Sequence, residues 1–134
     1  MKLKMILLWA FTASLAFSAE TSNWEGTFFW SKRKKQVENI TAAFEKDGKD
    51  WKATFTFKWG GKDHIYTGTA KGNMKSGNLT GKINSDDKRV RSFTFKGKIK
   101  DGKFEGTHKE TTKGRKKETG AMSLTLLEPE EEKK

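Results

Sequence analysis

The sequence predicts an all-β protein, built as a single eight-stranded antiparallel up-and-down β-barrel. Turn signals containing glycine, aspartate, asparagine or lysine recur at a near-even spacing and divide residues 20–127 into eight segments. A large apolar residue, any residue and a glycine recur along these segments, as in Phe95-Lys96-Gly97 and Phe104-Glu105-Gly106. A chain of 134 residues has room for one such domain.

Seven turns separate the expected strands. The Asp-Gly and Gly-Gly turns are the clearest, because they supply the positive φ angles that tight hairpins need. The second segment also fits a helical stripe from Val37 to Phe44, but the Asp47-Gly48 turn that follows it favours a hairpin. The expected strands are residues 24–31, 37–46, 50–59, 63–71, 77–85, 91–100, 103–111 and 116–127.

Turn lengths also predict which residues lie opposite each other in neighbouring strands. The pairs expected from the turns are Phe95 with His108, Gly97 with Gly106, Ala53 with Gly68, Phe44 with Trp51 and Gly68 with Gly81. When the other loops are set to match, small inward residues form one level belt around the barrel. The predicted belt contains Gly26, Ala42, Ala53, Gly68, Gly81, Gly97, Gly106 and Gly120.

The belt divides the predicted interior into two ends. Below it the inward positions are all apolar, so that end should be packed solid. These positions are Trp24, Phe44, Trp51, Ala70, Leu79, Ile99, Phe104, Met122 and Leu124. Above the belt apolar walls are mixed with polar side chains, which cost free energy unless they are paired or hydrated, so this end is the candidate mouth. The expected ligand-binding residues are Trp30, Phe57, His64, Tyr66, Phe93, His108 and Glu118.

Basic side chains gather in the loops expected around this mouth. The chain has 28 Lys and Arg against 17 Asp and Glu, a formal net charge of +11, which suits anionic partners. The expected basic rim contains Lys32, Arg33, Lys34, Lys35, Arg89, Arg91, Arg115, Lys116 and Lys117. An apolar cup beneath a cationic rim predicts a monomeric, non-enzymatic binding protein, without a cofactor, for a small amphipathic or acidic ligand.

Two other interpretations stay open. In the first, the barrel is filled and its basic loops bind an anionic polymer or surface, such as envelope lipid, acidic polysaccharide or nucleic acid, with steep salt dependence. In the second, His64, His108 and a carboxylate such as Glu118 converge as a metal site or an acid–base pair, although no closely spaced ligand motif is present.

The two ends of the chain differ from the barrel segment. Residues 1–19 carry two lysines, an apolar run from Met5 to Leu15 and small residues before an expected cleavage after Ser18 or Ala19, as in a secretory signal. The run is short for a transmembrane segment, so an exported protein, periplasmic or secreted, is expected. No cysteine is present, so the core must hold the fold without disulfides. The acidic tail at 128–134 is expected to be disordered.

The expected meander has its odd-numbered loops at one open end and Trp24 at the closed end of the first strand, and it resembles the lipocalin and avidin-like (calycin-type) barrels. The chain looks most like a small exported bacterial β-barrel. Lipocalins carry Gly-x-Trp on this strand, whereas here the glycine follows the tryptophan in Asn23-Trp24-Glu25-Gly26. The resemblance covers the architecture of the whole barrel segment and implies that a small ligand binds inside the cup.

Overall fold

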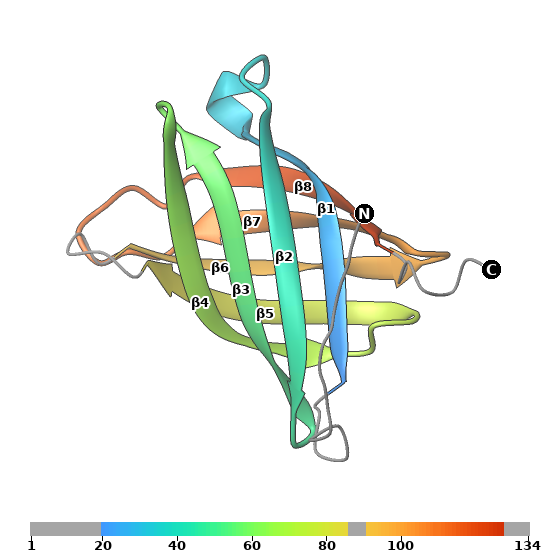
Figure 1. The fold of residues 1–134 in the computed structure, drawn as a ribbon. Coiled ribbons are helices and arrows are strands. Elements are labelled where there is room, and N and C mark those ends of the chain that lie inside the picture. Colours follow the sequence, from blue (N-terminus) through green and yellow to red (C-terminus); the bar gives the residue numbers. More distant parts are fainter. Residues whose placement is uncertain (1–19, 86–90, 128–134) are drawn as a thin grey trace.

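The computed structural model describes residues 20–85 and 91–127, which form a closed eight-stranded antiparallel barrel (Figure 1). The strands are β1 (Thr21–Trp30), β2 (Glu38–Asp47), β3 (Asp50–Trp59), β4 (Lys62–Gly72), β5 (Gly77–Ser85), β6 (Ser92–Lys100), β7 (Lys103–Glu110) and β8 (Thr119–Leu126). Each strand pairs with its neighbours in sequence, and β8 pairs with β1 to close the ring. The predicted fold class is confirmed, and the second segment is a strand rather than a helix.

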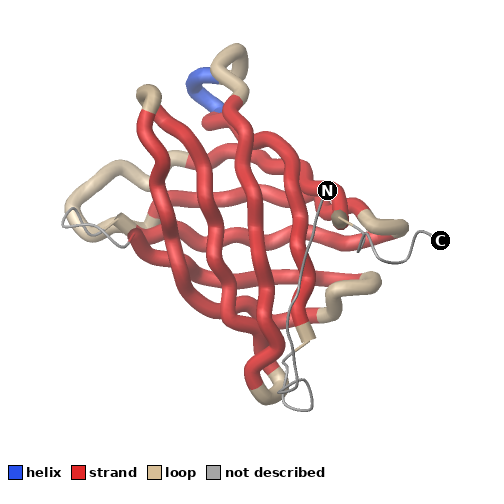
Figure 2. Tube along the Cα trace, in the orientation of Figure 1, coloured by secondary structure: helices blue, strands red, loops and turns tan. Residues whose placement is uncertain are grey.

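Two-residue turns connect β2 to β3, β3 to β4 and β6 to β7, whereas the β1–β2 and β7–β8 connections are longer loops (Figure 2). A short 3-10 helix, η3 (Ser31–Arg33), begins the β1–β2 loop, where the sequence predicts only a turn. The last strand begins at Thr119 rather than at 116, and residues 116–118 belong to the β7–β8 loop. In the part of the chain that the structure describes, no helix has the length and apolar character needed to cross a bilayer.

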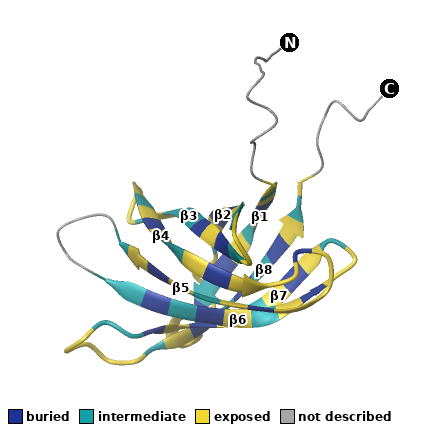
Figure 3. Ribbon diagram, turned by 90° about the horizontal axis from the view of Figure 1, so that it is seen from below, coloured by how far each residue is buried: buried dark blue, intermediate teal, exposed yellow. Residues whose placement is uncertain are grey.

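Burial alternates along every strand, with one residue facing the interior and the next facing solvent (Figure 3). This period of two is the pattern expected for a barrel with a packed interior. All the residues predicted to fill the closed end are buried, and Met74 from the β4–β5 loop is buried with them. The largest fully buried side chains are Trp24, Phe44, Phe55, Phe104, Leu79, Ile99 and Leu124.

Two of the predicted hairpin registers are confirmed. Gly97 lies opposite Gly106 across the β6–β7 turn, and Ala53 lies opposite Gly68 across the β3–β4 turn. In the β6–β7 turn Asp101 has a φ of 53° and the glycine after it a φ of 76°, as a two-residue type I′ turn requires. Both registers follow from turn chemistry that is visible in the sequence.

The β2–β3 register differs from the prediction. Phe44 lies opposite Ala53 instead of Trp51. Gly48 is the first central residue of this turn rather than the second, and its φ of 68° suits the first position of a type II′ turn. The Asp-Gly dipeptide does not reveal which of the two turn positions the glycine takes, and that position sets the register.

The β4–β5 register is also wrong in the prediction. Gly68 lies opposite Ile83 instead of Gly81. Four residues separate the two strands as expected, but the last pair between them is Gly72 with Leu79, so Gly77 and Asn78 pair only with β6. Met74 in this loop turns inward to 7% exposure and is buried at the closed end. Burial of this methionine adds apolar contact to the core at this end.

The predicted level belt of small residues does not form. Gly81 lies opposite Phe95, and Gly106 lies opposite Met122. A belt that returned to its own height after one circuit would leave the strands without the stagger that barrel closure requires. The glycines still face inward, and the absent side chain leaves space that a neighbouring residue occupies. A Cβ on Gly81, for example, would lie 2.5 Å from the Phe95 ring.

The expected signal segment at residues 1–19, the acidic tail at 128–134 and Arg89 of the expected rim lie outside the described residues.

Candidate functional site

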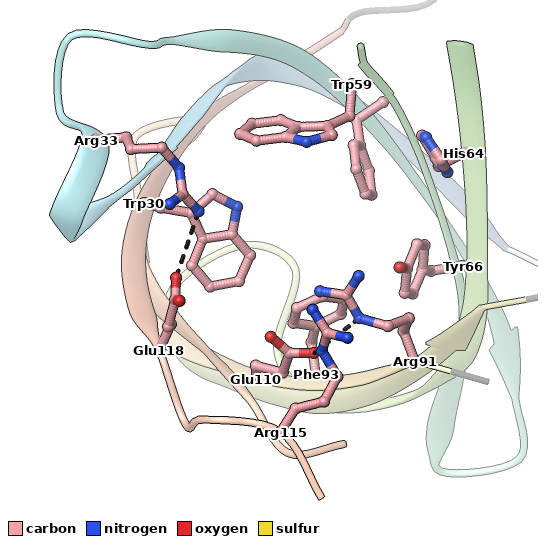
Figure 4. Close-up of a pocket in the computed structure, with 11 residues that line it drawn as sticks. Trp30, Arg33, Trp59, His64, Tyr66, Arg91, Phe93, Glu110, Arg115 and Glu118 are labelled. Carbon is pink, nitrogen blue, oxygen red and sulfur yellow. Dashed lines mark hydrogen bonds and ion pairs between the residues drawn. The ribbon is translucent and has the colours of Figure 1, made fainter. Parts of the chain in front are cut away.

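A cavity of about 180 Å³, here called the cup, lies at the end of the barrel that carries the β1–β2, β3–β4 and β7–β8 loops (Figure 4). This is the end that the sequence predicts to be open. Aromatic side chains from several strands form the wall, and charged side chains from the strand ends and loops surround the opening. The cup is lined by Trp30, Arg33, Phe57, Trp59, His64, Tyr66, Arg91, Phe93, Glu110, Arg115 and Glu118.

The aromatic rings of the wall form a continuous series of contacts around the cavity. Phe57 stacks on His64, with ring centroids 5.6 Å apart, and on Tyr66 at 5.3 Å. Phe93 continues the series, with its centroid 5.1 Å from that of Tyr66 and 5.5 Å from that of Trp30. The wall is therefore an arc of rings from β1, β3, β4 and β6 that presents an apolar, π-rich surface to the cavity.

Glu110 forms ion pairs with two arginines at the opening of the cup. Its side chain is only 5% exposed, and its Oε2 accepts a 2.7 Å hydrogen bond from Arg91 Nε. Arg115 Nε lies 3.1 Å from the same oxygen. Both contacts use Nε, so the terminal amino groups of the two arginines remain outside them, and Figure 4 shows these groups at the opening of the cup. Guanidinium groups held in this way can form paired hydrogen bonds with an anion.

A second ion pair lies on the other side of the opening. Arg33 Nη2 is 3.4 Å from Glu118 Oε1, and the Arg33 guanidinium carbon is 5.8 Å from the centre of the Trp59 ring. Three guanidinium groups and two carboxylates therefore line the cup, which leaves an excess of one positive charge. An excess of this size and sign favours a single anionic group at the opening.

His108 lies beneath the cup and does not line it. Its side chain borders an apolar void of about 30 Å³ and packs edge to face on Trp30, with ring centroids 4.5 Å apart. Neither ring nitrogen has a hydrogen-bond partner among the described residues. Burial lowers the pKa of His108 from 6.5 to about 4, so the imidazole is neutral at pH 7.

The structure brings together most of the residues expected to form the site. Of the expected ligand-binding residues, Trp30, Phe57, His64, Tyr66, Phe93 and Glu118 line the cup. Of the expected basic rim, Arg33, Arg91 and Arg115 line it. The remaining described rim residues are exposed in the loops and do not contribute to the lining: Lys32, Lys34, Lys35, Lys116 and Lys117.

Two cup residues, Glu110 and Trp59, are missing from the predicted site. Both could be found by the alternation of inward and outward residues along a strand. Glu110 follows the inward-facing His108 by two positions, and Trp59 follows the inward-facing Phe57 by two. The expected strands 50–59 and 103–111 already contain both residues, but the predicted site did not extend to the last inward position of either strand.

The alternative of a metal site finds no ligand set in residues 20–85 and 91–127. Within these ranges no three His, Asp or Glu side chains gather closely enough to hold a metal ion. His64 belongs to the cup wall and His108 to the apolar layer below it. The two imidazoles therefore belong to different layers of the barrel interior.

Neither a protein-family model, nor a curated protein, nor a solved structure matches the chain. Its likeness to known proteins is one of architecture. A closed eight-stranded antiparallel up-and-down barrel is consistent with a calycin-like architecture.

Replacing Glu110 by glutamine should lower the free energy of unfolding by about 1–2 kcal/mol, because two guanidinium groups lose a shared, buried carboxylate. The loss is reduced by the partial exposure of both arginines, 24% for Arg91 and 55% for Arg115. Denaturant unfolding measures this loss in the free energy of unfolding. Glu118→Gln is the matched control: its longer and more exposed ion pair should be worth less than about 1 kcal/mol. Equal losses in the two variants would contradict this role of Glu110.

Proposed function

We propose that this chain is an exported, lipocalin-like, non-enzymatic barrel that takes a small amphipathic acid into the cup. The single observation that carries the proposal is the buried Glu110, which holds Arg91 and Arg115 at the opening of an aromatic cavity. The rings remove the apolar body of a ligand from water, and the guanidinium groups pair with its anionic group.

The size of the cavity restricts the ligand. An apolar cavity of about 150 Å³ in another protein holds benzene. The cup, at about 180 Å³, suits a molecule with one ring or a branched chain of similar volume and a short acidic arm. A longer ligand would extend out through the opening, past the arginines. This favours a small aromatic or branched-chain acid over a long-chain lipid.

The charge of the opening restricts the ligand further. Glu110 and Glu118 already neutralise two of the three arginines, so one anionic group balances the cup. A ligand with two or three negative charges would bring excess charge close to Glu110. A carboxylate or another singly charged acid group therefore fits best.

Isothermal titration calorimetry with 3-phenylpropionate and 3-phenylpropanol tests the proposal, because the two probes share a ring and differ in charge. The acid should bind at least about tenfold more tightly than the alcohol, a difference of about 1.4 kcal/mol that one charge-assisted contact can supply. Arg115→Gln should remove most of this preference. Phe93→Ala should weaken both probes, because it removes a ring from the wall.

Lys117→Gln is the control for Arg115→Gln. It lies on the same loop and changes the net charge equally, but it does not line the cup. It should leave both affinities within about twofold, as expected for a screened surface charge. If neither probe binds, or if Lys117→Gln and Arg115→Gln have equal effects, the cup is not a site for small acids.

A further inference from the structure

The outward face of β4–β7 carries a regular array of lysine and threonine. Lys96 on β6 lies opposite Thr80 on β5 and opposite Thr107 on β7. Lys82 on β5 lies between two threonines in the same way. The array, here called the lysine wall, consists of Lys71, Lys82, Lys96 and Lys109 with Thr69, Thr80, Thr94, Thr107 and Thr119.

Two lysines on the neighbouring strand β3 face acids. On β3, Lys52 lies opposite Glu45, and Lys58 forms a 3.2 Å ion pair with Asp63. No residue of the lysine wall has an acidic residue opposite it in a neighbouring strand. Within the described strands the wall lysines therefore lack a directly opposed acid, in contrast to these lysines of β3.

One acid on this face, Glu105, lies beside the lysine wall and is directly opposite a lysine outside it. Glu105 on β7 lies opposite Lys98, one step along the strand from the wall, and its carboxylate accepts a 2.7 Å hydrogen bond from Ser123 Oγ. Further along the same two strands Lys100 lies directly opposite Lys103. Like charges in directly opposed positions destabilise a sheet, and this pair adds to the positive charge of the face outside the lysine wall.

The shape of this face suits a linear molecule. The registers place the wall lysines on successive strands at diagonal positions, which lie about 7–8 Å apart in an antiparallel sheet. They therefore form a line that runs across β4, β5, β6 and β7. The same residues line a shallow groove of about 960 Å³ on the barrel exterior, and threonine hydroxyls lie between the charges.

We propose that the lysine wall binds a linear acidic polysaccharide, with its carboxylate or sulfate groups on the lysines and its hydroxyls on the threonines. Charge complementarity carries this assignment. Nucleic-acid binding favours arginine forks and aromatic side chains on which bases stack. In the described part of β4–β7 no outward residue is an arginine or an aromatic. Phe29 of β1 also lines the groove, but a single ring does not supply a row of stacking positions. No residue of the lysine wall lines the cup, so this surface is independent of the site proposed above.

The test uses the full chain and fluorescently labelled heparin and polygalacturonate, with a 20-base-pair DNA duplex of similar charge as the competing polymer. The triple variant Lys82→Gln, Lys96→Gln, Lys109→Gln should weaken binding to both polysaccharides at least tenfold at 50 mM salt. It should also reduce the dependence of affinity on salt concentration. A variant with arginine at the same three positions should retain binding.

The control triple variant, Lys34→Gln, Lys49→Gln, Lys58→Gln, removes the same charge from exposed positions that are not paired with any residue of the wall. It should weaken binding less than threefold, and circular dichroism should show the same β-sheet content in all variants.

Equal losses in the two triple variants, or no binding of either polysaccharide at 50 mM salt, would overturn the proposal. Tighter binding of the DNA duplex than of both polysaccharides would assign the wall to a different polymer. Excess 3-phenylpropionate should leave polysaccharide affinity unchanged, which separates this site from the cup.

Discussion

Replacing Gly68 by alanine is expected to destabilise the barrel by about 3 kcal/mol or more, the upper range for added volume at a packed site. Gly68 faces inward on β4 and lies between Ala53 on β3 and Ile83 on β5. A Cβ on this residue would overlap the backbone carbonyl of Lys82. Backbone on a neighbouring strand cannot rotate away as a flexible side chain can, so β5 must shift. Denaturant unfolding, followed by tryptophan fluorescence, measures the loss.

Gly60→Asn provides the control for this change. Gly60 is a turn glycine with a φ of 65°, and a Cβ added to it would have no neighbouring atom within 4 Å. Asparagine tolerates this left-handed conformation, so the loss should stay below about 1 kcal/mol. A Gly68→Ala variant as stable as Gly60→Asn would show that β5 is not packed against this glycine in the way described.

Lowering the pH from 7 to 4 should cost the folded protein about 3 kcal/mol through His108 alone. The pKa of this imidazole is lowered by burial to about 4 in the folded state, whereas it is 6.5 in the reference state. Between these two values the unfolded chain binds a proton that the folded chain does not, so stability falls as the pH falls below 6.5. Below about 4 both states are protonated, and the contribution levels off.

His108→Leu isolates this effect from the titration of carboxylates. Leucine places no polar group in the apolar layer beside Trp30 and Phe28, so it suits these surroundings. The difference in unfolding free energy between the variant and the unmodified chain should grow by about 3 kcal/mol between pH 7 and pH 4. A constant difference over this range would mean that His108 is hydrated or paired in the folded protein.

The strands could be predicted from the sequence because each carries its own signal. Residues such as Phe93, Phe95 and Ile99 alternate with lysine and threonine on β6, and the turns between strands are marked by glycine. Registers were predictable only where the turn type was. Asp101-Gly102 forms the expected type I′ turn, whereas Gly48 begins a type II′ turn that the same dipeptide does not distinguish.

The cup was largely predictable, because inward positions follow from alternation alone and a shift of two residues leaves them inward. Phe57, Tyr66 and Phe93 therefore line the cup although the level belt that was used to place them does not exist. The depth of each residue was not predictable, because depth depends on barrel stagger. For that reason His108, expected at the mouth, lies in the layer below it.

Closure of β1 on β8 affects how the chain reaches this fold. Trp24 pairs with Leu126, so residues almost at opposite ends of the described sequence are neighbours. Contacts this distant along the chain give a high contact order, and the associated loss of chain entropy slows folding. The first strand thus has only one partner until the last strand has been synthesised. Folding of the whole ring must therefore wait for the C-terminal strand.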